Sequence, residues 1–246
     1  MSKKERIRYN SAAAKKLLEE IKSCREKGPR IDESRHSDIL YITGCTSDKS
    51  LEDETIPAYK RYIGGASRRM LEFYEKNKSL LDLYILSAGY GFIPANGAIQ
   101  KYNVSFNNVD SKLREIMAQR LELREDFGKL LDLGYKLVVL RLGPNYIKAL
   151  NSVDPDKGYE SPYKVPDSTT LLYIKPKSTD KILLQPSNGL TIETSGSELK
   201  RLSGCGLIND AQDKIWSDFF EKNKDKSTDE IIEKIINIKN FKELFQ

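Results

Sequence analysis

Four short apolar segments constrain the fold of this chain more than any other feature of its sequence. They are rich in β-branched and aromatic residues and are bounded by polar or turn-forming residues, as buried strands are. Helical patterns over residues 57–78 and 111–133 separate the first three segments. Alternating strands and helices are typical of a mainly parallel sheet that helices cover on both faces. The sequence therefore predicts an α/β fold, with strands at residues 38–44, 82–87, 135–142 and 169–175.

Helices are also expected at both ends of the chain. An N-terminal basic helix over residues 9–27 should end at Gly28, which Pro29 follows. Ser227 is a suitable cap for the last of three short helices that follow the sheet. These three are expected at residues 196–205, 211–222 and 228–245.

A chain of 246 residues suits one domain with small appendages. We expect an α/β domain over residues 1–195, which includes the N-terminal helix, and a C-terminal helical extension over residues 196–246. Within the first of these, the run at residues 181–184 is followed closely by Pro186. Because proline cannot donate to a central ladder, this run is predicted to be a hairpin or an edge feature.

Charge is concentrated at the N-terminus. Residues 1–30 carry ten basic and four acidic side chains, whereas the whole chain has 41 basic and 36 acidic residues. This excess favours an anionic partner, such as a nucleic-acid backbone. No apolar run approaches the ~18–20 residues needed to span a bilayer, and the N-terminus does not resemble a signal peptide. We therefore expect a cytoplasmic protein that has no contact with membranes.

Metal and cofactor chemistry has little support in the sequence. The cysteines, Cys24, Cys45 and Cys205, are far apart and predict neither a disulfide framework nor a structural zinc site. His36 is the single histidine, which excludes a centre with several histidine ligands. A Walker loop, a dinucleotide fingerprint and a hydrolase elbow are absent. We expect no metal and no cofactor, and interpret Cys45 as a small buried thiol.

The loops after the predicted strands are the places to look for a site, because ligands of parallel sheets bind beyond the carboxyl ends of the strands. The loop over residues 44–50 combines small residues and hydroxyls with the carboxylate of Asp48 and the ammonium of Lys49. After the third strand, Asn145 and Tyr146 are expected to point toward the same crevice. Arg141, inside that strand, should meet a carboxylate or a phosphate, since an unpaired buried charge is costly.

The loop after the second strand can present an aromatic surface. Gly89 and Gly91 flank Tyr90, so the backbone can turn sharply and expose Tyr90 or Phe92 for stacking on a base. The alternative is that both rings pack the loop onto the sheet. We favour packing for Phe92 and stacking for Tyr90.

Cations and aromatics alternate over residues 57–69, and two glycines there would weaken a continuous helix. Any one of these cations could belong to a solvated helix face. As a group, they favour contact with phosphates. The predicted phosphate contacts are Lys49, Lys60, Arg61, Arg68, Arg69 and Arg141.

Three motifs resemble those of a known superfamily. They read Gly44-Cys45-Thr46-Ser47-Asp48-Lys49, then Pro57-Ala58-x-x-x-Tyr62-x-Gly64, then Leu86-Ser87-Ala88-Gly89-Tyr90-Gly91-Phe92-Ile93-Pro94 with Ile99-x-x-Tyr102-Asn103. Over about residues 38–106 the chain is similar to the superfamily that includes the YaaA proteins, a domain of archaeosine synthase and relatives found near deazaguanine-modification genes. It departs from the usual pattern at Gly89, where a lysine is common, and at Asn103, where an aspartate is common.

The resemblance implies DNA or modified nucleobases as partners, and a sheet similar to that of uracil-DNA glycosylases. One group that it resembles consists of phage-defence DNA glycosylases that excise glucosylated hydroxymethylcytosine. Because those enzymes activate water from the loop after the first strand, the resemblance points to Asp48 as the catalytic carboxylate. Tyr90 would stack on an extruded base and Asn96 or Asn103 would read its edge. Ser87 and Tyr102 complete the predicted base-binding set.

Three functions remain open from the sequence. The leading hypothesis is a DNA glycosylase that acts on a modified base, with Asp48 facing an aromatic-walled hole. The second is a non-enzymatic DNA-binding protein of the YaaA type, in which Asp48 only caps a turn. The third is an enzyme that processes free deazapurines, for which the basic N-terminus has no obvious use.

Overall fold

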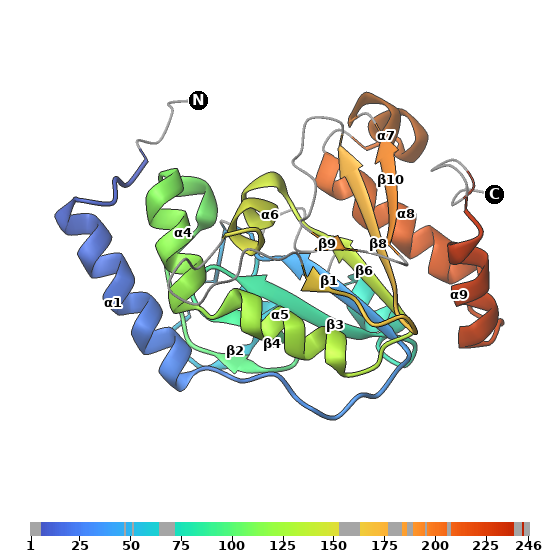
Figure 1. The fold of residues 1–246 in the computed structure, drawn as a ribbon, viewed down its shortest axis with the longest axis horizontal. Coiled ribbons are helices and arrows are strands. Elements are labelled where there is room, and N and C mark those ends of the chain that lie inside the picture. The colour runs from blue at the N-terminus through green and yellow to red at the C-terminus, as the bar shows by residue number, and fades with distance from the viewer. Residues whose placement is uncertain are drawn as a thin grey trace.

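A six-stranded sheet forms the centre of the computed structural model (Figure 1). The strands are β1 (Ile39–Gly44), β3 (Asp82–Ser87), β4 (Gly91–Pro94), β6 (Leu137–Arg141), β8 (Thr170–Pro176) and β10 (Gly189–Thr194). Their order across the sheet is β10-β8-β6-β1-β3-β4. All neighbours pair in parallel except β4, which is antiparallel to β3 at one edge. The predicted α/β fold with a mainly parallel sheet is confirmed.

The structure describes most of the chain, namely residues 6–46, 48–50, 52–63, 72–152, 163–176, 184–185, 189–194, 196–205, 208–238 and 243. Among the helices of these residues, none is long and apolar enough to cross a membrane.

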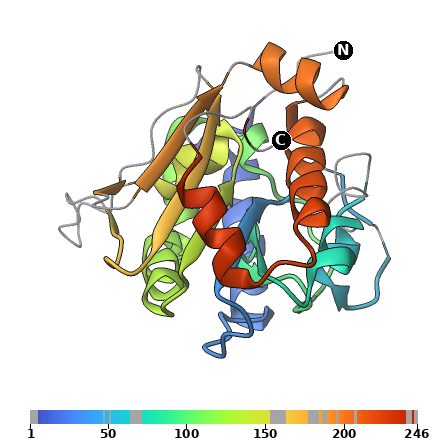
Figure 2. The same cartoon turned by 90° about the vertical axis from the view of Figure 1, so that its right-hand side faces the viewer.

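Helices cover both faces of the sheet, which explains why the strands are apolar along their whole length. Every residue of the central strand β1 is buried. On one face, the ring of Tyr41 lies 4.8 Å from that of Phe73 and 6.2 Å from that of Trp216, in α8 (Ile208–Lys222). On the other face, Phe92 stacks on Phe127 of α5 (Leu123–Asp132). Figure 2 shows α8 and α5 on opposite sides of the sheet.

Both terminal helical regions are present, although the first helix starts at Ala12 rather than at the predicted Tyr9. In α1 (Ala12–Lys27), the side chain of Ser11 accepts a hydrogen bond from the backbone of Ala14, and the helix ends at Gly28 as expected. The helices α7 (Gly196–Ser203), α8 and α9 (Thr228–Ile236) match the three expected after the sheet, although α9 ends earlier than predicted. Ser227 and Glu230 form a reciprocal capping box at the start of α9.

The helix predicted over residues 111–133 is two helices, α4 (Ser111–Arg120) and α5. Between them Glu122 adopts a left-handed conformation, with φ 52° and ψ 38°. Its carboxylate accepts a hydrogen bond at 3.0 Å from Arg25 of α1. A long-range ion pair therefore supports a break that the helical periodicity did not reveal.

The helix predicted over residues 57–78 is also interrupted. The structure has a single turn, α2 (Ala58–Arg61), and a helical stretch at residues 72–77, while residues 64–71 lie outside the described part. The described residues also form two small two-stranded sheets. They pair β2 (Ile56–Pro57) with β5 (Ala98–Ile99) and β7 (Tyr163–Lys164) with β9 (Leu184–Gln185). Of the run predicted at residues 181–184, the structure describes Leu184, in β9.

Two glycines provide a matched test of this backbone. Gly91 starts β4 at φ +81°, and a Cβ there would lie 3.0 Å from Arg25 Nη1 and 3.1 Å from the carbonyl oxygen of Leu121. We expect Gly91→Ala to destabilise the fold by roughly 1–3 kcal/mol. Gly128 lies inside α5 with open space around its would-be Cβ, so Gly128→Ala should stabilise by roughly 0.5–1 kcal/mol. Urea denaturation measures both, and changes of the same sign would contradict this account.

Candidate functional site

The parallel strands β1, β3 and β6 end at the same edge of the sheet, which we call the carboxyl edge. Their arrowheads point toward α6 (Pro144–Leu150) in Figure 1, and the short helix η1 (Phe106–Asn108) contacts α6. The loop predicted to bear the catalytic carboxylate, residues 44–50, follows β1 at this edge. It is the place where ligands of parallel sheets bind.

A network of buried hydroxyl groups lies at the carboxyl edge. Ser87, the last residue of β3, donates to the hydroxyl of Tyr102 at 2.7 Å, and the hydroxyls of Tyr102 and Tyr62 are 2.8 Å apart. Burial raises the pKa of both tyrosines well above its usual value. The network therefore consists of neutral hydroxyls.

The amine of Lys49 is buried beside this network. Its Nζ donates to the carbonyl oxygens of Thr46 and Val104, at 3.0 and 3.2 Å, and lies 4.7 Å from the ring centroid of Tyr102. Burial lowers the pKa of Lys49, and the nearby Cys45, Asp48 and Glu20 offset only part of that effect. Within the described residues, no carboxylate forms an ion pair with this amine.

Cys45 and Tyr146 form a second buried contact at the same edge. The hydroxyl of Tyr146 donates to the carbonyl oxygen of Cys45 at 2.5 Å and lies 3.0 Å from its thiol. Cys45 is a buried thiol and Tyr146 reaches the end of β1, as predicted. Asn145, in contrast, bonds Asn107 through its side chain.

Asp48 is exposed at the carboxyl edge, next to Lys49 in the chain. Its carbonyl oxygen accepts hydrogen bonds from the hydroxyl of Thr46, at 2.9 Å, and from the backbone of Ile63, at 3.0 Å. These contacts fix the backbone at this position. Because the residue is exposed, its carboxylate lies at the surface.

The predicted hole for a base is filled by the residues that were expected to line it. Tyr90 is only 3% exposed, and its ring meets that of Tyr102 edge-on at 5.2 Å. Its hydroxyl donates to the carbonyl oxygen of Gln100, so the prediction of a free stacking surface is wrong. Ser87 is also fully buried. Phe92 packs into the core, as predicted.

The predicted phosphate contacts are mostly internal. Arg61 is fully buried and donates to four backbone carbonyls, those of Ser50, Glu52, Glu54 and Ile99. A guanidinium has five N–H donors, so it can serve several carbonyls at once, and Arg61 is not available to a phosphate. Lys49 and Arg141 are likewise buried, and Arg141 donates to the hydroxyl of Thr43 at 3.2 Å. Lys60 is exposed, whereas Arg68 and Arg69 lie outside the described residues.

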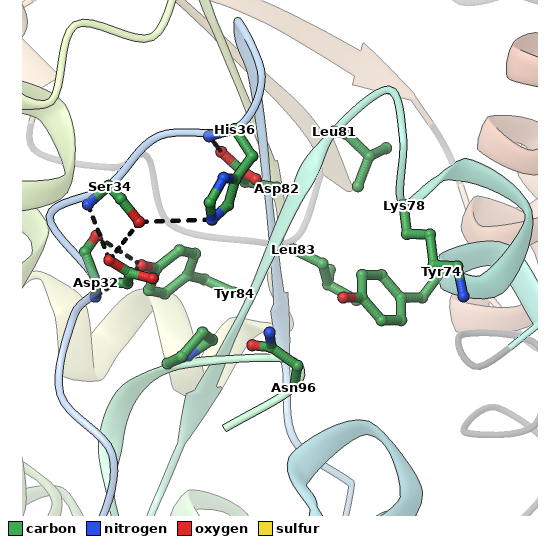
Figure 3. A pocket seen from close by; sticks show the side chains of 11 residues that line it. Asp32, Ser34, His36, Tyr74, Lys78, Leu81, Asp82, Leu83, Tyr84 and Asn96 are labelled. Atoms are coloured by element: carbon green, nitrogen blue, oxygen red, sulfur yellow. Dashed lines mark hydrogen bonds between the residues drawn. The ribbon is translucent and has the colours of Figure 1, made fainter. Parts of the chain in front are cut away.

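The two asparagines predicted to read a base lie apart. Asn103 is exposed near the carboxyl edge, where its backbone donates to Glu20. Asn96 instead lines a pocket of about 130 Å³ at the opposite end of β3 (Figure 3). There, the carboxylate of Asp82 accepts a hydrogen bond from the backbone of His36, at 3.0 Å. The β3–β4 hairpin returns the chain to this end, which the sequence alone did not indicate.

A larger cleft of about 560 Å³ lies between α5 and the segment after α1. Arg25 pairs there with Glu122, at 3.0 Å, and with Asp126, at 2.7 Å. Burial raises the pKa of Asp126, and Arg25 offsets part of that effect. Sequence reasoning missed this cleft, because its charges come from segments about a hundred residues apart.

The structural role of Arg61 can be tested by removing its charge. Arg61→Met leaves four backbone carbonyls without their donor, so we expect the free energy of unfolding to fall by roughly 3–5 kcal/mol. The matched control is Lys60→Met, at an exposed position, which should change stability by less than about 0.5 kcal/mol. Chemical denaturation measures both. Equal effects would show that Arg61 is not structural.

The buried tyrosines predict how stability depends on pH. Burial raises the pKa of Tyr62, Tyr102 and Tyr146 in the folded state. Their contribution to stability is therefore complete below about pH 10, the value of an unfolded tyrosine, and is lost as the pH rises toward the folded pKa values. Absorbance at alkaline pH should show these tyrosines ionising together with unfolding, unlike those of urea-unfolded protein. Their ionisation near pH 10 in folded protein would contradict the geometry.

Comparison with known proteins identifies the family but no activity. Searches of curated proteins and of solved structures each found no match. Residues 40–166, about half of the chain, match the model of a family of unknown function, DUF6884. This stretch includes β3, β6 and β1 except for its first residue, and therefore the carboxyl ends of all three strands. The chain belongs to the DUF6884 family.

Proposed function

We propose that the protein is a DNA glycosylase that hydrolyses the N-glycosidic bond of a modified base, acting in the cytoplasm in defence against phage. The observation that carries this proposal is the position of Asp48. Its exposed carboxylate follows β1 at the carboxyl edge, beside a buried amine and the hydroxyl network of Ser87, Tyr102 and Tyr62. The resemblance to phage-defence enzymes supplies glucosylated hydroxymethylcytosine as the substrate to test first.

In this mechanism the nucleotide is extruded from the duplex and its sugar lies at Asp48. As the bond between C1′ and the base breaks, the sugar gains positive charge and the base leaves with the bonding electrons. The carboxylate stabilises that charge and takes a proton from the attacking water, whose oxygen bonds to C1′. Because Tyr90 and Tyr102 fill the space between them, the base lies over the rim of the edge rather than between these rings.

The N-terminal arm, the described residues before α1, supplies exposed cations in place of Lys49, Arg61 and Arg141, which are buried. Ile7 donates to the carbonyl oxygen of Asn108, at 2.8 Å, and pairs with Val109 in a β-bridge. Arg6 and Arg8 flank it and are exposed. They lie beside η1, next to the carboxyl edge, where they support binding of a DNA backbone.

A specific observation favours the second candidate, a DNA-binding protein without catalytic activity. Side chains already fill the hole predicted for the base, and binding to a backbone needs no such hole. Such a protein would use the same exposed cations of the arm. The two candidates differ in whether bound DNA loses a base.

Substitution of Asp48 separates the two candidates. With duplex DNA that contains glucosylated hydroxymethylcytosine, we expect abasic sites with the wild type, and release slowed roughly 10²–10⁴-fold in Asp48→Asn, as for other catalytic acids and bases. The matched control is Asp53→Asn, because Asp53 is 83% exposed and pairs with Lys101 at the surface. DNA binding without base release by the wild type would support the second candidate instead.

A further inference from the structure

Lys49 is a buried cation that the proposed hydrolysis does not use. It is 8% exposed, and its amine lies between the carbonyl oxygen of Thr46 and the ring of Tyr102. Other buried cations have evident structural roles: Arg61 serves four carbonyls, and Arg25 pairs with two carboxylates. Lys49 has no carboxylate partner among the described residues, and its amine contacts two backbone carbonyls and the ring of Tyr102.

The contacts of Lys49 suit a neutral amine. A neutral amine has two N–H donors and one lone pair, whereas an ammonium has three donors. The two carbonyl acceptors, on Thr46 and Val104, match the two donors of the neutral form. The third neighbour of Nζ is the ring of Tyr102, whose centroid lies 4.7 Å away. Burial also lowers the pKa of Lys49, as in lysines that form imines with carbonyl substrates.

The location of Lys49 suits a sugar as its target. Asp48, the adjacent residue, has an exposed carboxylate at the same edge, and the proposed hydrolysis brings C1′ of the extruded nucleotide to it. Loss of the base leaves a sugar whose open form has an aldehyde at C1′. A recessed amine can meet such an aldehyde only when the nucleotide has left the duplex, which extrusion provides.

We propose that the Nζ of Lys49 is a nucleophile that forms an imine with the C1′ aldehyde of an abasic site and so gives the protein a strand-cleaving lyase activity. The inference rests on the proposed function, because base release supplies the aldehyde. It adds a second reaction and a second catalytic residue to the carboxyl edge.

The reaction balances without an oxidant, a reductant or a metal. The lone pair of Nζ attacks C1′, a C–N bond forms, and the aldehyde oxygen leaves as water. A proton is then removed from C2′, with the Asp48 carboxylate as acceptor. Its electron pair forms a double bond between C2′ and C3′, and the C3′–O bond breaks, which releases the downstream strand with a 5′-phosphate. Water hydrolyses the imine, frees the unsaturated aldehyde and restores the amine.

The test uses DNA that already contains an abasic site, so that it reads the lyase independently of base release. The full chain is incubated with this duplex and with borohydride, which reduces an imine to a stable amine. We expect a covalent protein–DNA adduct and, without borohydride, strand cleavage by β-elimination. Failure of this test leaves the hydrolysis by Asp48 standing, and failure of base release on modified DNA leaves this test unaffected.

Two variants and one mapping experiment assign the nucleophile. Lys49→Arg keeps hydrogen-bond donors at this position but cannot form the imine, so the adduct should be lost. Lys101→Arg, at an exposed lysine next to Tyr102, should retain it. Mass spectrometry of the wild-type adduct should place the DNA on Lys49, a result that does not depend on the variant folding. Absence of an adduct, its persistence in Lys49→Arg, or its location on another amine would overturn the proposal.

Discussion

The buried guanidinium of Arg61 is the interaction on which the rest of the carboxyl edge depends. It donates to carbonyls within residues 50–54 and to that of Ile99, so one side chain ties the segment after β1 to β5. A buried cation that lost these acceptors would carry its full desolvation cost, and the backbone is therefore held in one arrangement. Lys49 and Tyr62, at the two ends of the segment, pair in a β-bridge. Their positions at the site follow from this anchor.

The polar groups at the carboxyl edge are buried, so they form hydrogen bonds within the protein instead of with water. Ser87, Tyr102 and Tyr62 share hydrogen bonds among neutral hydroxyls, and Lys49 uses backbone carbonyls. In such surroundings charged forms are costly, so a tyrosine holds its proton and a lysine gives its proton up more readily. The exposed carboxylate of Asp48 lies beside them. The reactions proposed above at a sugar carbon would use this combination of a surface acid and a recessed amine.

The sequence predicted the position of the candidate site better than it predicted the roles of the residues there. It placed the loop with Asp48 and Lys49 after the first strand, and it brought Tyr146 to the same edge, because parallel strands share their carboxyl ends. It was wrong about Tyr90 and Arg61, which looked like a stacking surface and a phosphate contact. An aromatic beside glycines or a cation beside aromatics has the same local pattern whether it is exposed or buried. Only the packing of distant segments distinguishes the two.

The sequence by itself determined the α/β class, since runs of apolar β-branched residues between amphipathic helices bury both faces of a parallel sheet. It also determined the C-terminal end of α1 and the start of α9, because caps depend on residues a few positions apart. The tertiary structure decided the break at Glu122, where an arginine 97 positions away binds the carboxylate. It also decided which cations are internal. Periodicity and capping act over one or two turns, whereas burial and ion pairing depend on which distant segments meet, and that is settled only when the chain has folded.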